Sequence, residues 1–161
     1  MSVSPIPSLK KSLALALGAS LAVPTEPEGV ETVAVPVRFA APAFKPDRVA
    51  WAVVSVTPGV TRTVTGHRVR QQIDVFTNKA YDPTGALAEL AGSEVERLLT
   101  ERPKGADGGL LPGDGLFTFA SVSKLLGFTR EEAGPGGATI WHVVLEFVVS
   151  AQERRLTGTR F

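Results

Sequence analysis

Two stretches of the chain alternate hydrophobic and polar positions with a period of two, which predicts strands that bury one face. In TIWHVVLEFVVSAQ, the polar side carries His142, Glu146 and Ser150. The earlier stretch VRQQIDVF alternates in the same way, with arginine, glutamine and aspartate on its polar side. The apolar side of TIWHVVLEFVVSAQ consists of Trp141, Val143, Leu145, Phe147 and Val149.

The stretch YDPTGALAELAGSEVERLLTE has helical periodicity and clear start signals. Asp82 is expected to cap the first turn, and Pro83 suits the first helical position. Charged side chains, among them Glu94 and Glu96, face away from a single apolar stripe. These features predict a helix over 82–101. The stripe consists of Leu87, Leu90, Ala91, Val95, Leu98 and Leu99.

A long hairpin is predicted over 48–77. RVAWAVVSVT is rich in β-branched and aromatic residues and is apolar on both faces, which indicates a central strand. VRQQIDVF provides the antiparallel return strand, and the tip is expected between Pro58 and Gly66. Because the tip lies far from the other elements, this hairpin is expected to protrude.

The segment 24–47 holds five of the chain's 12 prolines, so it is expected to be extended. Within it, VETVAVPVRF alternates with a period of two and predicts a strand. Pro36 cannot donate a ladder hydrogen bond, which favours a sheet edge or an arm lying on a neighbour. The apolar side of this strand would carry Val33, Val35, Val37 and Phe39.

The last third of the chain predicts a second hairpin over 116–152. LFTFASVSKLLGFT is expected to form its first strand, and REEAGPGGAT is expected to be the turn that leads into TIWHVVLEFVVSAQ. The polar tail 153–161 is expected to fray or to dock elsewhere.

Near the amino terminus, KKSLALALGASLA supports two interpretations. The preferred one is a helix over 8–22 that starts after two prolines and carries Leu9, Leu13, Ala16 and Leu17 on one face. The alternative is a secretory signal, because two lysines precede a short apolar run and small residues. The apolar run is too short to span a bilayer.

These elements predict an α+β fold over one domain, 1–161. The expected architecture is a mostly antiparallel sheet of four to five strands, with two helices packed on one face and a protruding β-hairpin. A length of 161 residues and 43% hydrophobic content are sufficient for one core. The chain has no cysteine, which excludes disulfides, thiol nucleophiles and cysteine metal sites.

Groups suited to catalysis are scarce. His67 lies at the predicted hairpin tip, where exposure to solvent is expected, and His142 is expected to make a cross-strand hydrogen bond or an interface contact. GADGGLLPGDG and GPGG match no phosphate-binding fingerprint. Adjacent Glu131 and Glu132 would point to opposite faces of a strand. We therefore expect no catalytic, metal-binding or cofactor-binding residues and no enzymatic activity.

The predicted hairpin is locally basic although the net charge is only +1. Between residues 61 and 70 it carries Arg62, His67, Arg68 and Arg70 and no acidic residue. One interpretation is a solvated tip. The other is a basic arm that contacts an acidic partner surface or a phosphate backbone.

The order of elements resembles the tail terminator (tail completion) proteins of long-tailed bacteriophages. The resemblance is carried by a strand ending in DVF at 74–76, a helix ending in VERLL at 95–99, and the closing strand WHVVLEFVV at 141–149. The leading helix also fits, so the resemblance covers most of the chain. The segment 24–47 and the hairpin tip are larger than in the plainest form of the pattern.

This resemblance implies a non-enzymatic structural protein that forms a ring, typically a hexamer, on the head-proximal end of the tail tube. Such a ring would end tube polymerisation and offer a docking surface to the head connector or head-closure protein. The implied partners are other copies of the chain, the major tail tube protein and the connector, with DNA passing through the lumen and no membrane. The implied location is the virion tail or neck, and the host cytoplasm during assembly.

A head-to-tail ring needs two different complementary patches on each subunit. Arg62, Arg68 and Arg70, with His67, are the candidates for intersubunit or lumen contacts, and Glu94 and Glu96 are candidate acidic partners on the next subunit. Two alternatives remain open: another head-tail joining protein, such as a head-closure or connector component, and a secreted single-domain binding protein.

Overall fold

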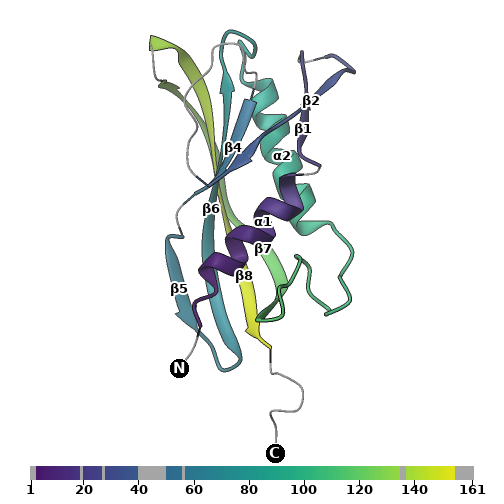
Figure 1. Cartoon of the computed structure of the whole chain (residues 1–161). Helices are drawn as coiled ribbons and strands as arrows, with labels where there is room; N and C mark the ends of the chain where they lie inside the picture. The colour runs from purple at the N-terminus through teal and green to yellow at the C-terminus, as the bar shows by residue number, and fades with distance from the viewer. Residues whose placement is uncertain are drawn as a thin grey trace, which may run out of the picture.

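The fold is an α+β arrangement of two helices and a mostly antiparallel sheet, which confirms the expected fold class (Figure 1). The computed structural model describes residues 3–18, 20–26, 28–39, 50–55, 57–134 and 137–154. In chain order the elements are α1 (Ile6–Gly18), β1 (Ala22–Pro24), β2 (Thr32–Ala34), β3 (Val37–Arg38), β4 (Ala50–Val54), β5 (Gly59–Arg62), β6 (Gly66–Asn78), α2 (Ala86–Thr100), β7 (Phe117–Ala133) and β8 (Thr139–Glu153).

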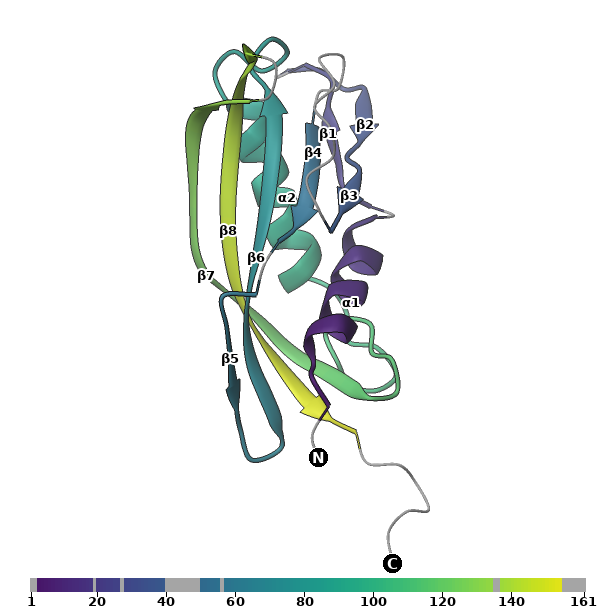
Figure 2. The same cartoon turned by 60° about the vertical axis from the view of Figure 1, so that its left-hand side comes forward.

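The main sheet has six strands, which is more than the four to five expected. Five of them follow the order β3-β4-β6-β8-β7, and β5 pairs with β6 beside this path. Among the strands of this sheet that the structure describes, β3 and β4 alone pair in parallel; the other pairings are antiparallel. β1 and β2 form a separate two-stranded sheet. Both helices lie on the same face of the main sheet, as expected (Figure 2).

Strand β6 is the spine of the sheet. It pairs with β8 from Gly66 to Asn78, while its other edge pairs with β5 along one half and with β4 along the other. β5 and β4 together form the first arm of the long hairpin predicted over 48–77. The turn lies at residues 63–65, where the Thr63 amide donates to the Gly66 carbonyl at 2.8 Å.

The main core lies between the helices and one face of the sheet, while Trp51, Val53 and Ile140 form a smaller buried cluster on the other face. The apolar alternation predicted for β8 is confirmed, because Val143, Leu145, Phe147 and Val149 are buried in this core. They pack with apolar side chains of both helices, and each fully buried side chain of this size contributes roughly 1.5–3 kcal/mol. The helical residues of the core are Leu9, Leu13, Ala16, Leu17, Ala88, Ala91, Val95 and Leu99.

The start of α2 differs from the prediction. The helix begins at Ala86 rather than at Pro83, and its N-cap is Gly85 with φ 80°, which is left-handed backbone that glycine adopts without strain. The indole of Trp141 packs against this glycine, since a Cβ there would lie 3.2 Å from the ring. Tertiary packing therefore fixes the helix start.

Asp82 is not the N-cap residue of α2, so its predicted position was wrong. Its side chain nevertheless accepts hydrogen bonds from the first turn of the helix, as a capping residue does. Its fully buried carboxylate accepts hydrogen bonds from the amides of Leu87 at 3.0 Å and Ala88 at 2.9 Å. The Thr77 hydroxyl donates a third bond at 2.8 Å. The backbone carbonyl of Asp82 accepts from the indole N–H of Trp141 at 2.8 Å. One residue thus ties β6, α2 and β8 together.

Three other boundaries are corrected. α1 occupies Ile6–Gly18 rather than 8–22, and residues 22–24 instead form β1. The single strand expected around Pro36 is two short strands, β2 and β3, that pair with different neighbours. The expected turn REEAGPGGAT begins too early, because β7 continues to Ala133.

The Pro36 carbonyl accepts from the Ala52 amide at 2.9 Å, so the chain changes sheets where proline cannot donate. β3 lies at the sheet edge, as the proline predicted. Residues 40–49 of the proline-rich segment and 155–161 of the tail lie outside the described residues. In the described part of the chain, no helix is both long and apolar enough to cross a membrane.

Candidate interaction surface

The basic residues of the β5–β6 hairpin are divided between the two faces of the sheet, and two of them have acidic partners in their own chain. Arg62 contacts Glu153 at 2.9 Å, and Arg70 contacts Glu146 at 2.5 Å. Arg68 is exposed. The hairpin is therefore less basic in the folded chain than in the sequence, and Arg68 is the arginine most available for other contacts.

His67 is buried, so the prediction that it would be exposed was wrong. Only 7% of the residue is accessible, and its ring lies edge-on to Phe117 with centroids 6.1 Å apart. The prediction failed because β8 extends far enough to pair with β6 down to Gly66, and Phe117 of β7 covers the position. Within the described residues its Nδ1 has no hydrogen-bond partner.

The predicted acidic partners lie on α2, away from the basic hairpin. Glu94 pairs with Arg97 of the same helix at 2.8 Å, and this hydrogen bond lowers the pKa of the Glu94 carboxyl. Glu96 lies 3.6 Å from the Lys124 ammonium of β7. The structure of one chain therefore does not bring the two predicted sets together, and their intersubunit role stays a prediction.

A polar cluster crosses three strands on the sheet face opposite the helices. Asp74 of β6 contacts His142 Nε2 at 2.5 Å, and His142 Nδ1 lies 3.2 Å from Glu132 of β7. Arg130 donates to the same Glu132 carboxylate at 2.9 Å. We call these four residues the Asp74 cluster. The cross-strand hydrogen bond expected for His142 is confirmed.

The Asp74 cluster favours the charged forms of both Asp74 and His142. Burial of Asp74 opposes ionisation, but hydrogen bonds from His142, Ser55 and Gln72 outweigh it and hold the carboxyl pKa below its usual value. Burial likewise opposes a charged His142, yet hydrogen bonds to Asp74 and Glu132 raise the imidazole pKa. The arrangement therefore favours an imidazolium held between two carboxylates.

The geometry of this cluster suits fastening strands together. The Ser55 hydroxyl donates to Asp74 rather than to His142, so the carboxylate stands between the serine and the imidazole. A serine nucleophile activated by histidine needs direct contact between those two side chains. Aromatic stacking of Phe76 on His142, with centroids 4.4 Å apart, further fixes the imidazole. Among the residues that the structure describes, no group of acidic and histidine side chains is arranged to hold a metal ion.

Sequence reasoning found His142 but not its partners. Asp74 and His142 were both placed on the polar sides of their strands, which is the signal that could have joined them. The missing information was the register, in which Asp74 lies opposite Val144, one diagonal step from His142.

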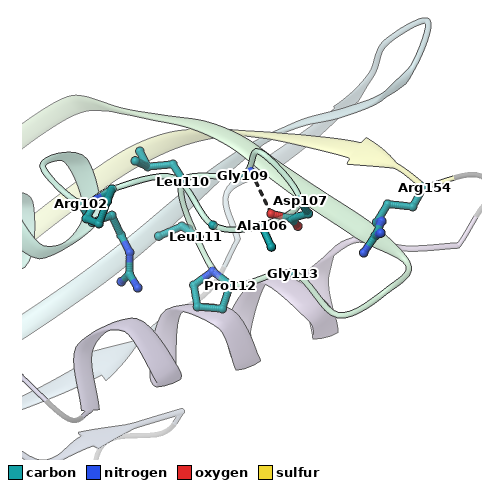
Figure 3. Close-up of a pocket in the computed structure, with 11 residues that line it drawn as sticks. Arg102, Ala106, Asp107, Gly109, Leu110, Leu111, Pro112, Gly113 and Arg154 are labelled. Atoms are coloured by element: carbon teal, nitrogen blue, oxygen red, sulfur yellow. Dashed lines mark hydrogen bonds between the residues drawn. The ribbon is translucent and has the colours of Figure 1, made fainter.

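The loop between α2 and β7 lines an open pocket of about 420 Å³ (Figure 3). Arg102 and Arg154 lie at opposite ends of it, with Asp107 and Gly113 between them. A Cβ on Gly113 would lie 2.4 Å from Asp107 Oδ2, so the loop requires glycine there. Pro112, beside Gly113, accepts a hydrogen bond from Ser12 of α1 at 2.6 Å. The pocket thus lies in a loop fastened to α1.

The outer edge of β7 is the least covered part of the sheet. β7 is the last strand of the sheet order, and within the described residues only its beginning is bonded on that side, where the Leu110 amide donates to the Phe119 carbonyl at 2.7 Å. Three large apolar side chains are exposed on this strand: Leu125 at 50%, Leu126 at 39% and Phe128 at 49%. A long edge with exposed apolar residues is typical of a surface that pairs with another chain.

A groove of about 270 Å³ lies beside this edge, between β7 and α2. Its acidic side chains are Glu89 and Glu96, and its basic side chain is Lys124. Gly127 and Val143 form part of its apolar wall. The groove therefore combines apolar and polar residues and carries more acidic than basic groups.

No protein-family model matches this chain, and no curated protein matches it. Among solved structures, the chain is similar to one chain of a structure described as "Virion of native gene transfer agent (GTA) particle". The match has a TM-score of 0.60 and 18% sequence identity, and it covers 94% of this chain and 99% of the other. At this identity the similarity shows a shared fold. It extends over nearly the whole of both chains.

Proposed function

We propose that this protein is a structural virion protein that forms a ring, a hexamer by the resemblance, on the head-proximal end of a phage-type tail tube. The ring ends tube polymerisation and provides the docking surface for the head connector. The observation that carries the proposal is the whole-length fold similarity to a chain of a gene transfer agent virion particle. Its host location is the cytoplasm during assembly and the virion afterwards.

Two features of the chain support an assembly role. The exposed apolar edge of β7 is a surface that a lone subunit leaves uncovered. The Asp74 cluster joins three strands of the sheet to one another, which suits a structural role. Arg62, Arg68 and Arg70, with Glu94 and Glu96, are the proposed contacts with other subunits or with DNA in the lumen.

Assembly tests the proposal directly. The purified full-length chain, alone and mixed with pre-formed tail tubes of the same particle, is expected to give closed rings in native mass spectrometry and to cap one end of the tubes in electron microscopy. Added during tube polymerisation, it is expected to shorten the tubes. Tubes polymerised without the chain are the control.

Two outcomes would contradict the tail-capping role. One is a chain that stays monomeric at high concentration and leaves tube ends bare. The other is a ring that binds the head connector but never binds tubes, which would indicate a head-closure or connector component instead.

A further inference from the structure

We propose that the outer edge of β7 is the docking site for β5 of a second copy, so that one antiparallel sheet continues from subunit to subunit. This inference rests on the proposed function, because it supplies the contact that would close a ring. It assigns the β5–β6 hairpin and the α2–β7 groove to one interface.

The β7 edge offers unpaired backbone. Beyond the hydrogen bonds that Phe119 receives, no strand in the described part of the chain pairs with the outer side of β7. Free edge amides and carbonyls form a template for another strand. Leu126 and Phe128 lie on the same edge, half exposed, and would be covered by an added strand.

β5 offers the complementary edge. Of the strands that the structure describes, it pairs with β6 alone, and its apolar Val60 is 40% exposed. β5 runs antiparallel to β6, β6 antiparallel to β8, and β8 antiparallel to β7. β5 and β7 therefore run in opposite directions. Rotation about an axis along the strands keeps these directions, so β5 of a neighbour arrives antiparallel to β7, the more stable pairing.

Charge and shape agree with this pairing. Val60 lies opposite buried Val69, and Arg62 opposite buried His67, so both project towards the helix side of the sheet. On that side, β7 carries the groove that Glu89 and Glu96 line. With Thr61 opposite Leu126, an arriving β5 would direct Val60 towards Gly127 and Val143 and Arg62 towards Glu96. The Arg62 side chain is 52% exposed, so it can exchange Glu153 for a new partner.

The two edges are different surfaces of one chain, so this contact is head-to-tail. Repeated contacts of this kind close into a ring when the rotation per subunit divides a full turn. A self-complementary contact would stop at a dimer. The pairing therefore gives an assembly of several subunits from one type of interface.

Engineered disulfides test the pairing, and the natural absence of cysteine keeps the background clean. Thr61→Cys is combined with Ser123→Cys or with Leu126→Cys; all three positions lie on the sheet face opposite the helices. β6 and β8 separate β5 from β7 by roughly 14 Å within one chain. A disulfide requires Cα atoms within about 7 Å, so any bond formed joins two copies.

On mild oxidation, at least one double variant is expected to give a ladder of linked chains beyond the dimer on a non-reducing gel. Each single-cysteine variant has one thiol and cannot exceed a dimer. Thr61→Cys with Lys124→Cys is the matched control, because Lys124 lies opposite core residue Phe147 and therefore on the helix side. This control is expected to give no ladder.

Hydrogen exchange of the unmodified chain provides a second measurement that needs no variant. Amides of β7 beyond Ser121 and of β5 are expected to exchange more slowly in the assembled protein than in dilute monomer. Rings in native mass spectrometry without a ladder or edge protection would overturn the pairing and leave the proposed function standing. An equal ladder from the face-mismatched control would also overturn the pairing. A chain that never assembles, even with tubes, would overturn both.

Discussion

Replacing Asp82 with alanine is expected to lower the free energy of unfolding by about 4 kcal/mol, because three hydrogen bonds to a fully buried carboxylate are lost at once. Two of the abandoned donors are amides of the first turn of α2, and the structure around them leaves little room for water. The measurement is urea denaturation followed by far-UV circular dichroism.

Asp114→Ala is the matched control for this prediction. Asp114 also accepts hydrogen bonds from two backbone amides, those of Leu116 at 3.0 Å and Phe117 at 3.1 Å, but it is exposed. Its loss is expected to cost about 1 kcal/mol, since water can replace it. Equal effects of the two substitutions would show that burial does not govern the contribution of Asp82.

Replacing Asp74 with alanine is expected to cost about 3 kcal/mol near pH 6, because His142 loses its closest partner and is left charged in a buried site. The size of the loss should depend on pH. The difference between wild type and variant is measured as the free energy of unfolding in urea across a pH series.

The direction of the pH dependence follows from the two shifted groups. The pKa of His142 is raised above 6.5, so its contribution is present below pH 6.5 and is lost as pH rises through the raised value. The pKa of Asp74 is lowered below 3.8, so its contribution is present above pH 3.8 and is lost as pH falls through the lowered value. The difference in the free energy of unfolding between wild type and Asp74→Ala should therefore be greatest between pH 3.8 and pH 6.5.

Glu153→Gln is the comparison for the Asp74 cluster. It weakens the exposed pair with Arg62, which is expected to change stability by less than about 1 kcal/mol and without this pH profile. If Asp74→Ala cost the same at pH 5 and pH 9, the pair with a charged His142 could not be the source of the loss.

Features that depend on local periodicity were predictable. The alternation from Trp141 to Val149 identified the core face of β8. The stripe of α2 identified residues that pack on the sheet, except for Leu90, which is 43% exposed. Pro36 correctly indicated an edge position. In each case the signal lies within one element, because side-chain spacing alone fixes which face is buried.

Features that depend on contacts between distant segments were not predictable. His67 looked exposed because a hairpin turn precedes it, yet two strands from the end of the chain cover it. Asp82 was predicted to be the N-cap of α2. The actual N-cap is Gly85, and its position depends on packing against Trp141, which the sequence does not show. The Asp74 cluster required the register of three strands. The β7 edge was missed because strand order decides which strand is outermost.

Strand β8 follows β7 in the sequence but lies between β6 and β7 in the sheet. While the ribosome is still making β8, β6 lacks its longest neighbour and β7 has almost nothing to pair with. The sheet cannot fold until these distant strands are present. Folding is therefore slow, and unpaired strands that are prone to aggregate are exposed early. The nascent chain therefore exposes the unpaired edges of β6 and β7 before β8 is made. Crowded polysomes or a rise in temperature should increase its aggregation, unless a chaperone covers β6 until β8 has been translated.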